Sequence, residues 1–584
     1  MADQITSGQT AKHPKGLYYL FFTEMWERFG YYLMLGIFSL YMLDSWNNGG
    51  MGFPAAKKSD IYGTYLGLVY LTPFIGGLLA DRVLGYRKSI IIGGLMMSAG
   101  YFMLSLHDNT SFFIALLLII LGNGFFKPNI STLVGNLYNN DLLKDKKDSG
   151  YNIFYMGINI GAFVCNFVAA YMRINYGWGH AFAAAGVGML IGVAIFIIGT
   201  KHIKHVDVIN PVKPGDMSTL KILGLTVFPM LVFGTIGYFI NGVTSATNPD
   251  GNIFKSDTND AFLFGCTPIV LFFIYLAVKS PLEERRPIKA LLAVFTCVIL
   301  FFAIFHQNGD ALTVWAEDYT DRKMPDAVAQ VAGKVNMTQI VANDEVVALD
   351  DETFKAKISE LRAVENNMPE TTKEEGDAKK AFGRIIGEKE ASRKYFSNLP
   401  AAEVPAQGSD LKLYSTELYQ SINPFWVVLL TPVLVGFWGF LRKRKKEPST
   451  PTKIAIGLVI TALSALVMVG AVMATNDLTS KASSWWLIAS YGVITLGELC
   501  LSPMGLSLVS KLSPPRITAL MMGGFFLAIS VGNKLSGVLS SLWEDIEQKE
   551  NFFLLNFGLV MAAAIMLFLM LGWLNKVMKE KNVH

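Results

Sequence analysis

Long apolar runs recur along the chain from about residue 17 to residue 575, and short polar stretches separate them. A helix rises about 1.5 Å per residue, so runs of twenty or more residues are typical of helices that cross a hydrocarbon core of roughly 30 Å. The pattern therefore predicts an all-α membrane protein with fourteen spans, arranged as six, two and six: 17–43, 59–83, 87–106, 111–135, 150–172 and 179–200, then 219–240 and 261–279, then 290–318, 420–441, 453–474, 484–510, 515–541 and 552–575.

The two outer groups of six predict paired helical bundles, because repeated six-helix halves are common in secondary transporters. We divide the chain accordingly into five parts: an N-terminal bundle at 1–200, a linker with two extra transmembrane helices at 201–289, the first helix of the C-terminal bundle at 290–319, an insert at 320–413, and the rest of the C-terminal bundle at 414–584.

Composition supports a membrane protein and excludes several other classes. Of the 584 residues 52% are hydrophobic and only 16% are charged. The net charge of +4 is small and no basic block suggests nucleic acid. The four cysteines lie inside apolar runs without metal-ligand spacing, so we expect small buried hydrophobic residues and neither disulfides nor a metal site.

Loop charges predict the orientation. Lys and Arg are concentrated in alternate loops, most strongly at 442–446 and after the last span, which indicates that these loops and both termini are cytoplasmic. The insert at 320–413 then lies outside the cytoplasm. It contains strand-like alternation at 334–349 and helical periodicity at 351–365, so we expect a small folded periplasmic unit.

The first span carries ionisable groups at membrane depth. Glu24, Glu27 and Arg28 are spaced i, i+3, i+4 and therefore share one helix face. Ionisable groups in hydrocarbon are costly and usually line a pathway or pair with one another. Two acids and one base leave one acid in excess, and that acid can carry a proton.

Three further motifs accompany this triad. GGLLADR at 76–82, with Asp81 and Arg82, stands at the turn between the second and third spans. FFKPNIS at 125–131 lies in the fourth span, and YNIFYMGINIGAF at 151–163 in the fifth. The first resembles the signature loop of major facilitator transporters, whose role is to lock the cytoplasmic side. Together with EMWERFGYY at 24–32, the set resembles the proton-coupled oligopeptide transporter (POT or PTR) family, in the bacterial form with two extra helices.

The residue chemistry is consistent with a zwitterionic substrate. Lys127 is a lone base within the fourth span and Glu498 is a lone acid in the other half, so a substrate or a salt bridge could connect them. The resemblance implies that Lys127 and Arg28 face a peptide carboxylate and that Glu498 faces its amino group. It also assigns further polar residues to the pocket lining: Tyr32, Tyr70, Asn159 and Asn423. For Lys127 the alternative is a snorkelling base, and for Tyr70 and Asn423 it is hydrogen bonding between helices.

One pair of positions departs from the family. Many bacterial members carry an Arg on the first helix and an acid on the seventh, where this chain has Leu35 and His306. Asp310 follows His306 at i+4, so on a continuous helix a protonated His306 could pair with Asp310 and bias a gate between the halves. We therefore add His306 to the proton-coupling residues Glu24, Glu27 and Arg28, and Asp310 to the conformational residues Asp81 and Arg82.

The sequence thus predicts a proton-coupled symporter in the bacterial cytoplasmic membrane that imports di- and tripeptides by alternating access. Its coupling ion is the proton, and we expect no cofactor, no catalytic residues and a functional monomer. Two alternatives remain open: a family member that carries another anion or a conjugate, such as nitrate, and a membrane enzyme or receptor that works through the insert. The insert contains neither cysteine nor histidine and no glycine-rich phosphate loop, which weighs against the last reading.

Overall fold

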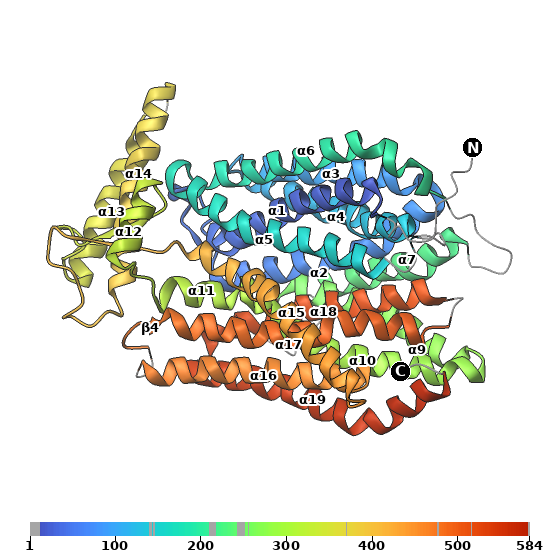
Figure 1. Ribbon diagram of the computed structural model, residues 1–584. Helices are drawn as coiled ribbons and strands as arrows, with labels where there is room; N and C mark the ends of the chain where they lie inside the picture. The colour runs from blue at the N-terminus through green and yellow to red at the C-terminus, as the bar shows by residue number, and fades with distance from the viewer. Residues whose placement is uncertain are drawn as a thin grey trace.

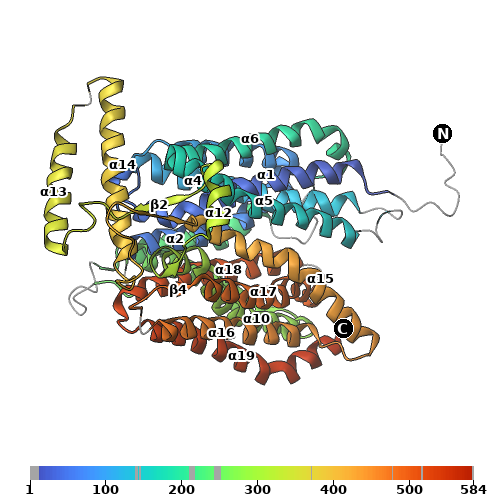
Figure 2. The same ribbon diagram turned by 60° about the vertical axis from the view of Figure 1, so that its left-hand side comes forward.

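The computed structural model describes residues 12–138, 143, 147–209, 218–241, 251–254, 256–369, 371–475, 478–514 and 517–581. Long helices in these ranges form two bundles that lie side by side, with a small unit at one end (Figure 1). We call the end that carries this unit the outer end and the opposite end, where α1 begins and α19 ends, the inner end (Figures 1 and 2).

The N-terminal bundle buries one continuous apolar core between its helices. In this bundle α1 packs on α5 and α6, and α3 packs on α4. Its helices are α1 (Lys15–Leu43), α2 (Ala55–Leu79), α3 (Tyr86–Leu104), α4 (Asn109–Leu137), α5 (Lys147–Tyr176) and α6 (Trp178–Ile203), with a 3-10 turn η1 (Trp46–Asn48) between α1 and α2.

The C-terminal bundle has a large core and a second, outer cluster. Its first helix is interrupted, and the others are continuous. The elements are α10 (Leu282–Phe305), the 3-10 turn η5 (His306–Gly309), α11 (Ala311–Asp318), the 3-10 segment η6 (Thr416–Ser421), α15 (Ile422–Lys443), α16 (Thr450–Ala474), α17 (Ser484–Leu512), α18 (Thr518–Asp545) and α19 (Lys549–Glu580).

The two extra helices, α7 (Thr219–Tyr238) and α9 (Asp257–Lys279), pack on each other, and α9 also contacts α2, α10 and α18. Contact between the bundles runs mainly through α2 and α18 and through α5 with η6 and α15. The described residues thus form two helical bundles, an added helix pair and a small insert, as the expected fold class requires.

Twelve helical segments among the described residues are long and apolar enough to cross a membrane. The expected spans at 17–43 and 87–106 are also helices, α1 and α3, but they do not meet that criterion. In α1 the charges of Glu24, Glu27 and Arg28 lower the mean hydropathy of the helix. Helix α3 is only 19 residues long, and its first turn contains Arg87 and Lys88. The count of fourteen spans thus stays a prediction.

Glycines decide how closely the N-terminal helices approach one another. A Cβ on Gly76 of α2 would lie 2.0 Å from the carbonyl oxygen of Gly124 on α4. A Cβ on Gly161 of α5 would lie 2.3 Å from the carbonyl oxygen of Met25 on α1. Because only a hydrogen fits there, these motif glycines hold α4 against α2 and α5 against α1, next to the charged face of α1.

The insert folds around an apolar core of its own, with Val341, Ile386 and Leu413 at its centre. Its strands β2 and β3 pair in antiparallel fashion, and the short β1 pairs in parallel with β4 from the α16–α17 loop. A capping box at Thr372 and Glu375 begins the long helix α14. The elements are β1 (Thr320–Asp321), α12 (Asp326–Lys334), β2 (Gln339–Ala342), α13 (Asp351–Asn367), α14 (Lys373–Phe396), β3 (Asp410–Leu413) and β4 (Ala482–Ser483).

Helix α10 differs from the expected span at 290–318 at both ends. It begins eight residues earlier, at Leu282, because Glu283 and Glu284 in its first turn favour a helix N-terminus outside the hydrocarbon. It ends at Phe305, and the 3-10 turn η5 separates it from α11. The backbone of Asp310 has φ −123° and ψ −89°, so residues on either side of the break do not share a helix face.

Candidate functional site

The triad on α1 forms a closed ionic cluster. Glu24, Glu27 and Arg28 are at most 3% exposed. The Arg28 guanidinium donates from Nη2 to Glu27 Oε1 at 2.7 Å and from Nε to Glu27 Oε2. Its Nε also lies 3.2 Å from Glu24 Oε1. One arginine therefore holds two carboxylates, and Glu24 Oε2 is buried without a hydrogen-bond partner among the described residues.

Lys127 of α4 lies close to the triad, yet it forms no ion pair with any described residue. Its Nζ stands 4.0 Å from the ring centroid of Tyr70 on α2, a cation–π geometry. The Tyr70 ring in turn meets His306 edge-on, with centroids 5.8 Å apart. Lys127, Tyr70 and His306 are only partly buried, as is Tyr32, whose ring packs against Tyr31.

Glu498 of α17 is the corresponding acid in the C-terminal bundle. Its Oε2 accepts a hydrogen bond of 3.2 Å from Asn423 Nδ2 on α15, and Asn423 also donates to Thr495 Oγ1 at 2.8 Å. No described cation pairs with Glu498. Its side chain is partly exposed, like that of Asn423. Asn159 of α5 donates to the carbonyl of Tyr155 in its own helix at 3.0 Å.

His306 and Asp310 do not contact each other in this structure. Because the helix breaks at η5, the two side chains leave the i, i+4 relation. Asp310 is ion-paired with Lys58 of α2 and also accepts from Ser59. His306 packs among the rings of Tyr70, Phe302 and Phe305, and its Nδ1 has no partner among the described residues. The proposed pH-dependent pairing of His306 with Asp310 thus loses its structural basis.

Three ion pairs in the described chain join the bundles, all in their outer halves. The first is Lys58 with Asp310, both side chains at most 3% exposed. In the second, Arg173 at the end of α5 makes a two-point contact with Glu417 of η6, which is fully buried, and also donates to Ser415 Oγ at 2.9 Å. In the third, Lys534 Nζ of α18 lies 2.6 Å from Asp60 Oδ1 of α2. Of these six partners, only Asp310 is expected from the sequence to have a functional role.

The loop at the inner end that resembles the major facilitator signature is held by a residue from a distant part of the sequence, Asp207. Asp81 and Arg82 lie in a π-helical turn, Ala80–Leu84, and Asp81 accepts a hydrogen bond of 2.5 Å from Tyr86 Oη. The N-terminus of α3 is capped by Asp207, beyond α6, which accepts from the backbone N–H of Tyr86 and from Arg87 Nε at 2.7 Å. Asp207 thus holds the first turn of α3, and it could not be predicted from the sequence because it lies 121 residues from Tyr86.

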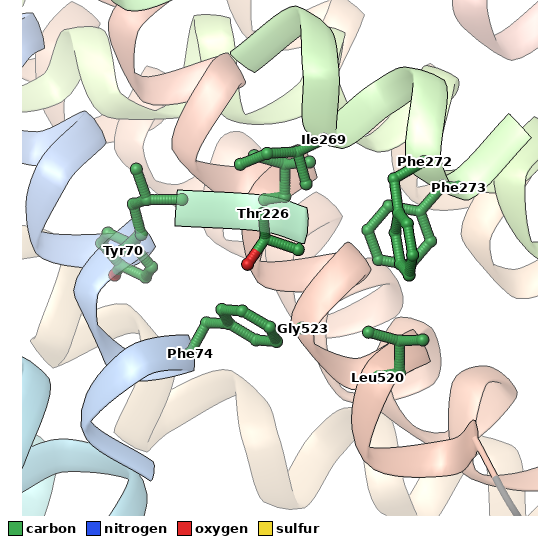
Figure 3. Close-up of a pocket in the computed structure, with 10 residues that line it drawn as sticks. Tyr70, Phe74, Thr226, Ile269, Phe272, Phe273, Leu520 and Gly523 are labelled. Atoms are coloured by element: carbon green, nitrogen blue, oxygen red, sulfur yellow. The ribbon is translucent and has the colours of Figure 1, made fainter. Parts of the chain in front are cut away.

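A small apolar cavity of about 20 Å³ lies between α2, α18 and the extra helix pair (Figure 3). Tyr70 stands at its edge, with Phe74, Thr226 and Phe273 among the other lining residues (Figure 3). This volume admits about one water molecule and is far too small for a peptide. Tyr70 thus separates the polar residues near Lys127 from an apolar space beneath the helix pair.

Comparison with known proteins shows the family to which the chain belongs. A model of the POT family matches residues 87–332 and 412–557. The chain belongs to the POT family. The stretch between the two matched segments falls within the insert. The resemblance seen in the sequence motifs is thereby confirmed.

Individual relatives align over most of this POT-family chain. It is 29% identical over 538 residues to the di-/tripeptide transporter of Lactococcus lactis subsp. lactis. This alignment covers 91% of this chain and 90% of the relative. The chain is 25% identical over 534 residues to dipeptide and tripeptide permease A of Escherichia coli, covering 91% and 85%. A crystal structure of the peptide transporter POT in complex with sulfate superposes with a TM-score of 0.71 and 26% identity, covering 97% and 96%.

Proposed function

We propose that this POT-family protein is a proton-coupled symporter that imports di- and tripeptides by alternating access. The observation that carries the proposal is the placement of Lys127 and Glu498. They are opposite charges in opposite bundles, each partly exposed and each without an ionic partner among the described residues. A peptide zwitterion supplies the two missing partners, its carboxylate for Lys127 and its ammonium for Glu498. Binding would then connect the two bundles.

The remaining polar residues fit a site that reads the peptide backbone. Tyr32, Tyr70, Asn159 and Asn423 offer hydroxyl and amide groups that can donate or accept. None of them carries charge, so they can hold peptides with different side chains. A bare anion such as nitrate would match Lys127 but leave the Glu498 carboxylate unpaired, so the arrangement favours the peptide over the anion.

The triad on α1 supplies the coupling step of the proposal. In the structure Arg28 is held by both carboxylates. Protonation of one carboxylate removes one of the two attractions and frees the guanidinium to turn towards the peptide carboxylate next to Lys127. Proton entry would therefore favour peptide binding and peptide binding would favour proton entry, as linkage between two sites requires.

We further infer that the outer end is closed in this structure. The Lys58–Asp310, Arg173–Glu417 and Lys534–Asp60 pairs all hold the bundles together there. By the distribution of Lys and Arg, the outer end with its insert faces the periplasm and the termini face the cytoplasm of a bacterial cell. Opening to the periplasm then requires these buried pairs to separate.

Uptake into proteoliposomes tests the proposed substrate class. With an inward proton gradient, labelled dialanine is expected to accumulate, and unlabelled di- and tripeptides should compete. Nitrate at the same concentration should not. Competition by nitrate but not by peptides would replace the proposed substrate by an anion, and liposomes without protein measure the leak.

Replacing Glu498 with Ala is expected to weaken binding of free dipeptides by a factor of about thirty or more. The substrate ammonium then loses its only carboxylate partner in a partly desolvated site, a cost of order 2–5 kcal/mol. A dipeptide with an acetylated amino group has no ammonium to pair and should bind wild type and variant alike. Competition assays with both peptides decide the role: equal weakening of the two would show that Glu498 does not read the amino group.

A further inference from the structure

The insert is built onto the C-terminal bundle. Strand β1 pairs with β4 through Thr320 and Ala482. Lys481, in the same loop as β4, donates to the carbonyl of Asp318 at 2.8 Å and to Asn398 Oδ1 at 2.6 Å. Within the insert, Arg322 is 1% exposed and donates to Gln339 Oε1 at 2.7 Å. These contacts make the insert and the outer end of the C-terminal bundle one body.

The same insert reaches across to the N-terminal bundle. Helix α14 runs across the outer ends of the bundle helices (Figure 2) and contacts the 3-10 turn η1 between α1 and α2. Two glycines one turn apart, Gly383 and Gly387, make room for this turn. A Cβ on Gly387 would lie 2.1 Å from the side-chain amide of Asn48, and one on Gly383 would lie 3.1 Å from the carbonyl oxygen of Asn47.

A prearranged acceptor completes the contact. Glu365 of α13 is 3% exposed and is held by Arg362 Nη1 at 2.9 Å, while Arg362 Nη2 binds Glu390 at 2.6 Å. The carboxylate of Glu365 accepts from Asn47 Nδ2 at 3.2 Å. At a second point Asn175, at the end of α5, donates to the carbonyl of Asn336 at 2.9 Å.

The character of the contact distinguishes it from a permanent interface. It is formed by asparagine amides, backbone, glycine and the Glu365 carboxylate, which also has Arg362 of the insert as a partner, and no residue of η1 is buried. Separation therefore exposes little apolar surface, and water can replace the hydrogen bonds at small net cost. Between parts that move relative to each other, such small polar interfaces are the expected kind.

We propose that the insert is a latch of the outer gate: it moves with the C-terminal bundle and holds the outward-closed state through the contact of α14 with η1. Opening of the outer end carries Asn47 and Asn48 away from Gly383 and Gly387, and closure restores the contact. This inference rests on the proposed alternating-access function. It assigns a role to the insert, most of which lies outside the two segments that the family model matches.

Crosslinking across the latch tests it directly. In full-length protein, the double variant Asn48→Cys with Gly387→Cys is expected to form a disulfide on oxidation. Dialanine uptake should then fall at least tenfold and return on reduction. The matched control is Asn398→Cys with Lys481→Cys, which joins the insert to its own bundle and should leave uptake unchanged. Undiminished uptake by the fully crosslinked latch variant would overturn the latch, whereas failure of uptake by reduced wild type would instead overturn the proposed function.

A second pair of variants removes the need for crosslinking. Gly387→Leu places a side chain where Asn48 lies, and Gly376→Leu adds the same side chain on α14 in open space. Spin labels at the exposed positions 57 and 323 report the distance between the outer end of α2 and the insert. Gly387→Leu should shift the distribution of this distance towards longer values, and Gly376→Leu should match wild type. Identical distributions for all three proteins would show that the contact does not hold the outer end.

Discussion

Replacement of Glu27 with Gln is expected to abolish proton-driven accumulation of dialanine while leaving peptide exchange in place. Gln keeps an oxygen for Arg28 but cannot titrate. Glu27 is fully buried and bound at two points by Arg28, so its proton binding is coupled to the position of the guanidinium. Counterflow exchanges peptide for peptide without net proton movement, and the variant should retain it.

Proteoliposomes with and without a proton gradient separate the two activities. We expect accumulation at the level of protein-free liposomes and counterflow within about threefold of wild type, a difference of roughly 0.7 kcal/mol. Glu27→Asp, which keeps a titratable acid, serves as the control and should retain part of the accumulation. Full accumulation by Glu27→Gln would assign coupling to another group.

The second large effect is expected at the outer gate. Asp310→Asn removes the partner of Lys58 and leaves a buried ammonium uncompensated, a change that typically costs about 3–5 kcal/mol. The cost falls on the closed state, so the ratio of closed to open protein should drop by about two to four orders of magnitude. Uptake should fall with it, because the cycle depends on both states being reached.

Replacing both residues of the ion pair with apolar residues should restore closure of the outer end. The double variant Lys58→Met with Asp310→Leu leaves no buried charge and should recover much of the uptake lost in the single variant. The matched control is Arg286→Ala, which breaks the exposed pair with Glu580 and should change uptake little. Labelling of a cysteine at the outer end measures gate opening, and equal labelling of Asp310→Asn and wild type would contradict a gate role for this pair.

The sequence was sufficient for the helices and for much of the candidate site. Long apolar runs predict spans because the bilayer fixes their length, and the triad on α1 was recognisable because three charges share one face inside such a run. The placement of Lys127 and Glu498 in opposite halves follows from the order of the spans. Roles for these residues remain proposals.

Long-range ion pairs and helix breaks could not be predicted from the sequence. Lys58 looked like a loop residue next to a span, and only the fold brings it to Asp310, 252 residues away. The i, i+4 spacing of His306 and Asp310 does not put them on one helix face, because the chain breaks at η5, and the sequence shows no sign of this break. Arg173 with Glu417 and the capping of α3 by Asp207 were missed for the same reason as Lys58: no local pattern links partners that meet only in the folded protein.

Proton and peptide are expected to cross the membrane together through one site. The most direct measurement is peptide-driven proton entry into proteoliposomes that contain a trapped pH dye and start without a pH gradient, with a membrane potential negative inside. Addition of dialanine outside is predicted to acidify the lumen in wild type but not in Glu27→Gln or Glu498→Ala. Peptide uptake by wild type without any acidification would contradict the account.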